Sequence, residues 1–234
     1  MSTPTVPVSG QDSIQWRIPE VFHSLGLEME PAERTEYLEG LAAELWASGT
    51  DFQRQTVSHW YQQIAEAVAQ DGALEAAFCI LRNGDRITTA TLAITAEPLE
   101  AEPDVSVTLA GLVEALSASA SKEVMRVDTE AGPAVVALSS LRMTTPGLEG
   151  EDQGQGGSLD LAQVVAYLPC PIVSQLLVLT LCTPTIEDLP DYVGLLAQVT
   201  DTVQVNVGDL PEQPDAARAS GGSFGRGTVR DVFG

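Results

Sequence analysis

Histidines and paired carboxylates are the side chains that most often catalyse proton transfer, and this chain offers few candidates of either kind. Only two of its 234 residues are histidines. His59 stands beside Trp60 and Tyr61, where it could act as a general base in a cleft or simply lie on a helix surface. Glu149 and Glu151 fall in a Gly-, Glu- and Gln-rich stretch, whereas acid–base catalysis needs rigidly held carboxylates with shifted pKa values. These residues predict no catalytic centre.

Metal, disulfide and nucleophile motifs are also missing from the sequence. Cys79, Cys170 and Cys182 lie in apolar runs without Cys-x-x-Cys spacing, which predicts buried apolar packing. No group of Asp, Glu and His has metal-ligand spacing, and no glycine-rich phosphate loop follows a predicted strand. Residues 221–225 match Gly-x-Ser-x-Gly, but no histidine follows them and they lie outside any strand-to-helix turn. We therefore expect no enzyme activity, no cofactor and no metal.

The charge of the chain excludes other classes of partner. The formal net charge is -22, from 33 acidic and 11 basic residues, and Lys122 is the single lysine. Nucleic acids and anionic membranes need clustered positive charge, so neither is an expected partner. The acidity either keeps the protein soluble or provides a surface for a basic partner. The low lysine content, with abundant Ala, Gly and Arg, is typical of high-GC actinobacterial proteomes.

The start of the chain and its hydropathy predict a cytoplasmic protein. The first ten residues lack the basic and apolar parts of a signal peptide, and no apolar run is long enough to span a membrane. Residues 1–13 are polar and proline-rich, which predicts disorder. We expect one α+β domain over residues 14–206, followed by a flexible linker and docking peptide over 207–234.

Two helices are predicted near the start of this domain. Pro31 begins the first, and its apolar positions recur at helical spacing until Gly49. Thr50 and Gln53 form a capping box for the second helix, because each side chain can bond the other's backbone N–H. The predicted apolar face of this second helix consists of Val57, Trp60, Tyr61, Ile64 and Val68.

Strand patterns follow as hairpins. The Asn83-Gly84 turn joins runs 76–81 and 86–95, and further hairpins are predicted over 123–139 and 161–183. Helices are predicted over 105–117 and from about Thr185 to Val199, and a last strand follows Thr202. Consecutive hairpins imply an antiparallel sheet of about six to seven strands, with helices packed on a face.

The end of the chain carries the most specific functional signal. Residues 208–215 form a Pro- and acid-rich linker, and an apolar and basic tip follows. The candidate partner-binding residues are Phe224, Arg226, Val229, Arg230, Val232 and Phe233. A purely solvating tail is not expected to carry two phenylalanines. The tip either orders on a protein partner, where residues 228–233 could add a strand to a sheet edge, or folds back onto its own acidic domain.

The core resembles the PsbP-like α/β/α family, which includes mycobacterial lipoproteins, over roughly residues 74–206. The resemblance rests on the hairpins and on Leu179-Thr-Leu-Cys-Thr-Pro-Thr-Ile-Glu-Asp188, which precede Tyr192-Val-Gly-Leu-Leu196 and a last strand. It implies a non-catalytic binding or assembly role. This chain differs from the family in having no lipobox cysteine, an added helical pair and the tail.

Three functional hypotheses remain. The first is a cytoplasmic, non-enzymatic binding or adaptor protein that docks on a multiprotein assembly through its tail. The second is an accessory chaperone of a specialised secretion system, whose acidic helical face around His59, Trp60 and Tyr61 holds a partner. The third is a small enzyme with an unrecognised site. A binding module should expose an apolar patch or an open sheet edge, whereas a pocket lined by titratable groups would favour the enzyme.

Overall fold

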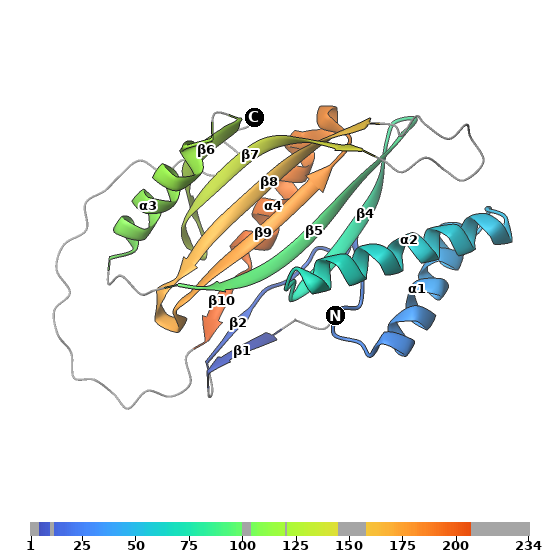
Figure 1. Ribbon diagram of the computed structural model, residues 1–234, viewed down its shortest axis with the longest axis horizontal. Coiled ribbons are helices and arrows are strands. Elements are labelled where there is room, and N and C mark those ends of the chain that lie inside the picture. The colour runs from blue at the N-terminus through green and yellow to red at the C-terminus, as the bar shows by residue number, and fades with distance from the viewer. Residues whose placement is uncertain (1–4, 10–11, 100–103, 120, 145–157, 207–234) are drawn as a thin grey trace.

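A sheet of seven antiparallel strands forms the centre of the molecule, and helices lie against it (Figure 1). The computed structural model describes residues 5–9, 12–99, 104–119, 121–144 and 158–206. The strands are β1 (Thr5–Ser9), β2 (Asp12–Gln15), β3 (Phe22–Ser24), β4 (Glu75–Asn83), β5 (Arg86–Pro98), β6 (Lys122–Thr129), β7 (Gly132–Thr144), β8 (Ser158–Cys170), β9 (Gln175–Thr183) and β10 (Gln204–Asn206). The helices are α1 (Pro31–Leu45), α2 (Asp51–Gln70), α3 (Val105–Ser117) and α4 (Leu189–Asp201), with short 3-10 turns η1 (Pro171–Val173) and η2 (Ile186–Asp188). The predicted α+β class and the N-terminal helical pair are confirmed.

The strand order of the large sheet is β3-β4-β5-β9-β8-β7-β6. The three predicted hairpins are present as β4–β5, β6–β7 and β8–β9. In the first, Asn83 pairs with Arg86, and Gly84 takes a φ of 62°, which glycine adopts without strain. Strand β5 then pairs with β9, so segments about 90 residues apart in sequence form the middle of the sheet.

A smaller sheet joins the two ends of the folded region. Its strand order is β1-β2-β10, and Ile14 of β2 lies opposite Val205 of β10. Strand β1 falls inside residues 1–13, where the sequence predicted disorder, and β3 was not predicted. Strand β3 has three residues, too few for alternation to reveal it, and its partner β4 is about 50 residues away in sequence. Strand β1 pairs with the neighbouring β2.

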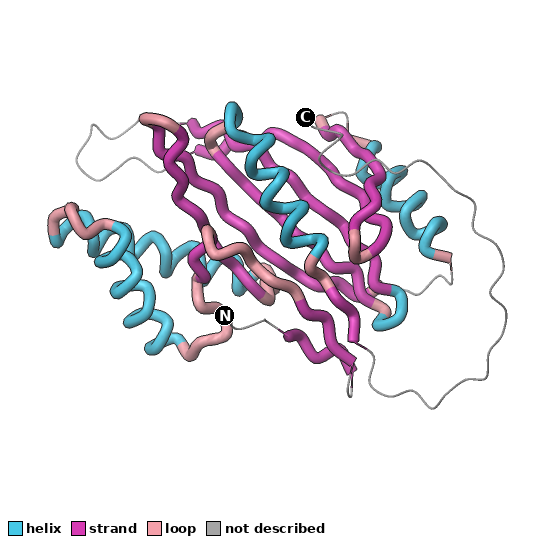
Figure 2. The backbone as a smooth tube through the Cα atoms, turned by 180° about the vertical axis from the view of Figure 1, so that it is seen from behind, coloured by secondary structure: helices cyan, strands magenta, loops and turns pink. Residues whose placement is uncertain are grey.

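The two faces of the large sheet carry separate hydrophobic cores. Helix α4 crosses one face (Figure 2), where its side chains pack against inward residues of β4, β5, β8 and β9. Helices α1 and α2 cover β3 and β4 on the opposite face. Alternation along β4 serves both cores, because Ala77 and Cys79 face α4 while Ala76 and Phe78 face the helical pair. Helices therefore cover both faces, where the sequence had predicted a single covered face.

Candidate protein-binding face

Three large apolar side chains line the outer side of α2. Phe52 is 78% exposed, Trp60 48% and Ile64 38%. Residues four apart lie one above the other on a helix, so Phe52, Thr56, Trp60 and Ile64 form one slowly turning row. We call Phe52, Trp60 and Ile64 the α2 ridge. Aromatic residues make up 5% of this chain, and two of them stand in this exposed row.

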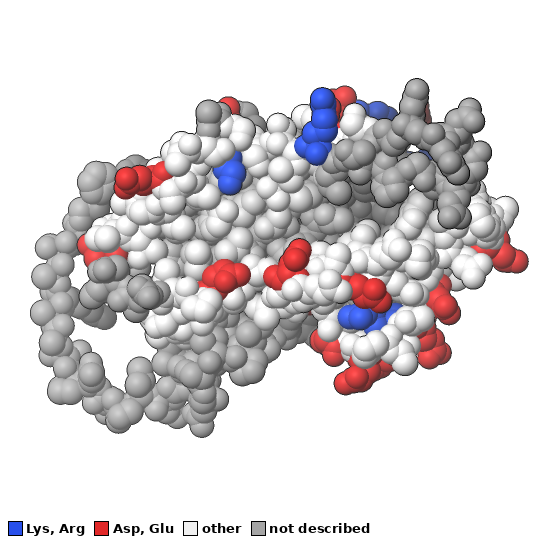
Figure 3. Space-filling model, viewed as in Figure 1, with Lys and Arg blue, Asp and Glu red and all other residues white. Residues whose placement is uncertain are grey.

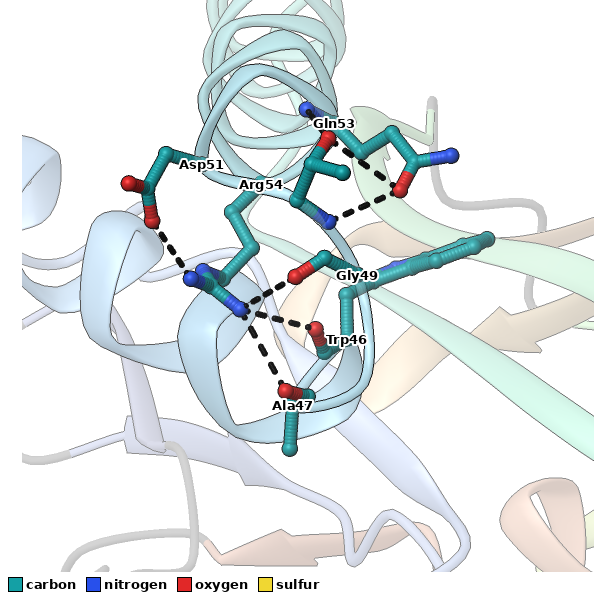
Figure 4. Close-up of polar contacts among 7 residues, drawn as sticks. Trp46, Ala47, Gly49, Asp51, Gln53 and Arg54 are labelled. Atoms are coloured by element: carbon teal, nitrogen blue, oxygen red, sulfur yellow. Dashed lines mark hydrogen bonds and ion pairs between the residues drawn. The ribbon is translucent and has the colours of Figure 1, made fainter.

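The start of α2 is fixed by the predicted capping box (Figure 4). The backbone N–H of Gln53 donates to Thr50 Oγ1 at 3.2 Å, and the backbone N–H of Thr50 donates to Gln53 Oε1 at 2.8 Å. These two bonds satisfy amide groups that have no partner inside the helix. The first turn of α2, which carries Phe52, is held in one position as a result.

Arg54 ties this first turn of α2 to the end of α1. Its Nη1 donates to three backbone carbonyls, those of Gly49 at 2.6 Å, Ala47 at 3.3 Å and Trp46 at 3.5 Å. Its Nη2 pairs with Asp51 Oδ1 at 2.5 Å (Figure 4). A cation beside the last carbonyls of a helix also opposes the negative end of the helix dipole. The two helices therefore meet in one defined turn.

Three consecutive residues of α2 point in three directions. Tyr61 faces the sheet, where its ring stacks on Phe78 with 4.3 Å between centroids, and burial raises its pKa. Each residue advances about 100° around a helix, so Trp60 projects from the side of α2. His59 lines an open hollow of about 540 Å³ between α1 and α2 and lies 3.0 Å from the Gln63 amide nitrogen. The single binding face expected for His59, Trp60 and Tyr61 does not exist.

Trp60 lies on the side of α2 that faces away from α1. Ser58, which is buried, and Gln62 line the α1 side of the helix, and their side chains bond to each other at 3.4 Å. Ser58 and Trp60 are separated by about 200° around the axis. Trp60 is therefore turned away from α1, whereas Phe52, at the start of α2, also lines the hollow between α1 and α2. The end of the ridge that carries Trp60 and Ile64 borders the middle of the sheet, which α2 and α3 leave uncovered (Figure 1).

The middle of that sheet face is formed by small and weakly polar side chains. Neighbouring strands place Thr91 opposite Cys182, Ala93 opposite Thr180 and Thr95 opposite Val178. All six are partly exposed, and Figure 3 shows few charged side chains over this area. A covering helix would be expected to bury a continuous apolar strip of the sheet. These six side chains instead form an uncharged, partly exposed surface beside the α2 ridge.

Acidic side chains surround the ridge on the helical pair. Residues 28–71 contain nine Asp or Glu and two Arg, and one of these arginines, Arg54, is already bound to carbonyl groups and Asp51. Figure 3 shows this acidic group over α1 and α2. An apolar row inside a negative field favours a ligand that combines apolar side chains with positive charge.

A second candidate site lies on the other face of the sheet. An open hollow of about 670 Å³ lies between the β4–β5 turn and the start of α4. Its charged and polar lining includes Arg82, Asp191 and Gln198, which are exposed, and Asp188 and Tyr192, which are buried. Titratable groups around a hollow would favour an enzyme. The hydrogen bonds of these groups show whether they are available to a ligand.

Most buried polar groups of this hollow bond to other protein groups, whereas Asp188 Oδ2 is buried without a hydrogen-bond partner in the part of the chain that the structure describes. Asp188 Oδ1 accepts from Asn83 Nδ2 at 2.8 Å and from Arg86 Nη2 at 3.1 Å. The Tyr192 hydroxyl lies 2.6 Å from Thr88 Oγ1, and burial raises the pKa of Tyr192. These bonds join the β4–β5 hairpin to α4. No histidine or cysteine is among the described residues that line the hollow.

The cysteines and acids of the described ranges do not form another reactive centre. Cys79 and Cys170 are buried, and burial raises the pKa of each thiol to about 11, which keeps both protonated at neutral pH. Cys182 is half-buried, and burial also raises its pKa. Within the described ranges, no three His, Cys, Asp or Glu residues are placed to hold a metal ion. No helix in the same ranges is long and apolar enough to cross a bilayer.

The six candidate residues of the tail, from Phe224 to Phe233, lie outside the described residues. The α2 ridge was partly predictable, since Trp60 and Ile64 were assigned to an apolar helix face; Phe52 was not. Searches of family models, curated proteins and solved structures found no match to this chain. The PsbP-like resemblance therefore stays a prediction, and any function rests on the surfaces described above.

Proposed function

We propose that this chain is a non-enzymatic adaptor that binds protein partners, docking on a larger assembly through residues 216–234 and holding a protein segment on the α2 ridge. The exposure of Phe52, Trp60 and Ile64 is the observation that carries this proposal. Large exposed aromatics on a rigid helix are typical anchors of protein interfaces. The acidic side chains around the ridge favour a partner with basic residues at its rim.

The proposal places the protein in the cytoplasm. Its three cysteines are all unpaired, as expected in a reducing compartment. The acidic surface also argues against nucleic acids and anionic membranes as partners, because both repel negative charge.

An affinity pull-down from the source cells tests both parts of the proposal. The full chain is compared with a variant that ends at Asp215, with Trp60→Ala and with the control Ile172→Ala. Ile172 is 68% exposed on η1, away from the ridge, so its loss matches the change in exposed apolar surface. A partner that is lost on truncation identifies the tail as a docking peptide. A partner lost with Trp60→Ala and kept with Ile172→Ala identifies the ridge. Recovery of the same partners by all four proteins contradicts the proposal.

An accessory chaperone of a specialised secretion system is a second proposal, favoured by the same α2 ridge. A chaperone keeps its partner soluble, whereas an adaptor only connects it to an assembly. Co-expression separates the two, because a chaperone raises the soluble yield of the recovered partner and Trp60→Ala removes that gain. The third hypothesis is an enzyme whose active site is the hollow at Asp188. An enzymatic activity that is lost in Arg82→Ala would favour this hypothesis.

A further inference from the structure

The α2 ridge and the last segment of the chain have complementary chemistry. The ridge is apolar and lies among nine acids and two arginines. From Ala216 onward the chain carries three arginines, one acid and two phenylalanines. In a protein with a net charge of -22, this is the segment whose sign is opposite to that of the helical pair. The segment therefore offers apolar side chains to the apolar ridge and positive charge to the acidic residues around it.

The chain is long enough for the two to meet. Strand β10 ends at Asn206, and Phe224 lies eighteen positions further along the chain. At about 3.3 Å per residue this stretch spans up to about 60 Å. A domain of this size has a radius of gyration of about 17 Å. Phe224 can therefore reach well beyond the end of β10, over most of the surface of its own domain.

Tethering makes a weak interaction sufficient. A short flexible connection gives an effective concentration on the order of 1 mM, so a dissociation constant of about 100 µM for the untethered pair keeps about nine of ten molecules docked. No contact beyond two or three apolar anchors and one or two ion pairs is needed for such an affinity.

We propose that residues 220–234 bind in cis to the α2 ridge, with Phe224 or Phe233 against Trp60 and with Arg226 and Arg230 toward the acidic side chains of the helical pair. This inference rests on the proposed function, because it pairs the two surfaces that the adaptor uses for partners. Each surface masks the other in the free protein. A partner must displace the peptide to reach the ridge, and its binding releases the peptide for docking on the assembly.

Photo-crosslinking of the full chain tests the proposal. Phe224→p-benzoylphenylalanine is illuminated at low micromolar concentration, and the crosslinked peptides are mapped in the monomer band. We expect crosslinks to residues 50–70. Trp60→Ala should lower their yield about threefold, since an aromatic anchor is worth on the order of 2 kcal/mol. The control Ile172→Ala should leave the yield unchanged. Raising the ionic strength from about 0.05 M to about 0.5 M should lower the yield further.

Tryptophan quenching by acrylamide gives a readout without the probe. Trp16 is fully buried, so the quenching reports on Trp46 and Trp60. The double variant Phe224→Ala and Phe233→Ala of the full chain should show increased quenching if the peptide covers Trp60. Equal quenching contradicts the proposal. So do crosslinks confined to a dimer band, crosslinks elsewhere on the domain, or a yield that ignores Trp60→Ala. These results leave the pull-down intact, so a failure of cis docking is distinguishable from a failure of the proposed function.

Discussion

Glu75 begins β4 in a buried position beside Ser24 of β3, and its ionisation opposes folding. Its side chain is 8% exposed, and Ser24 Oγ donates to its Oε1 at 3.0 Å. Burial raises the pKa of Glu75 to about 7; the charge of Glu28 adds to this rise, and the bonds from Ser24 and the backbone of Ala76 oppose it. The ordinary value is 4.5. The folded state therefore binds a proton at Glu75 more tightly than the unfolded state does.

The magnitude and sign follow from these two values. Above pH 7 the carboxyl is ionised in both states, and the folded state bears a penalty of about 3 kcal/mol. As the pH falls from 7 to 4.5, the folded state takes up the proton first, and the penalty shrinks by about 1.4 kcal/mol per pH unit. Glu75→Gln is neutral at every pH and keeps an oxygen for Ser24. The variant should thus exceed the native protein in stability by about 3 kcal/mol at pH 8 and by less than about 1 kcal/mol at pH 5.

Urea unfolding followed by tryptophan fluorescence measures this difference at pH 8, 6.5 and 5. Comparing the two proteins at each pH cancels the repulsion among the other acidic side chains, which also changes with pH. Glu66→Gln, at an exposed position of α2, is the matched control and should change stability by less than about 0.5 kcal/mol throughout. A constant difference between Glu75→Gln and the native protein, or a variant that is less stable at pH 8, would refute the reasoning. Either result would mean that Ser24 and the Ala76 amide stabilise the ionised carboxylate.

Two further substitutions test the contacts that position the two candidate sites, again by urea unfolding. Thr50→Ala removes the α2 cap and should cost about 1 kcal/mol, whereas Thr50→Ser should recover most of it; equal losses would show that the cap contributes nothing. Asp188→Ala removes the acceptor shared by Asn83 and Arg86 and should cost about 1–3 kcal/mol. An unchanged stability for Asp188→Ala would mean that water replaces the carboxylate without loss.

Local patterns predicted the elements of this fold but not all of their partners. The α1–α2 pair and the hairpins depend on periodicity, capping and the Asn83-Gly84 turn, which are encoded within about twenty residues. Strand β10 was expected to close the core, and Val205 does pack against it, but the strand pairs with β2 in a separate sheet and not with the large sheet. The sequence of β10 does not distinguish pairing with β2 from pairing with the large sheet, because a three-residue strand is placed by its tertiary contacts. The face of the sheet that each helix covers likewise depends on how the chain connects that helix to its neighbouring strands.

The same limit applies to the α2 ridge. Helical periodicity showed that Val57, Trp60, Tyr61 and Ile64 share an apolar arc. The arc spans about 100°, with Trp60 at one edge and Tyr61 at the other. Which edge of it meets the sheet depends on where α1 packs, and that contact involves Ser58 on the other side of the helix. The sequence could therefore identify the apolar residues but not the ones that remain exposed.

Tyr61 and Trp60 are adjacent in α2, and substitutions at them should separate effects on folding from effects on binding. Tyr61 packs on Phe78 and accepts a bond from Trp46, so Tyr61→Ala should cost about 3 kcal/mol and loosen the helical pair. Trp60 makes neither contact and is about half exposed, so Trp60→Ala should cost clearly less than Tyr61→Ala, about 1 kcal/mol. About half of the Trp60 side chain stays exposed in the folded domain, and a ligand on the ridge would cover that half. If Trp60→Ala destabilises the protein as much as Tyr61→Ala, the ridge is part of the core and the binding proposals lose their support.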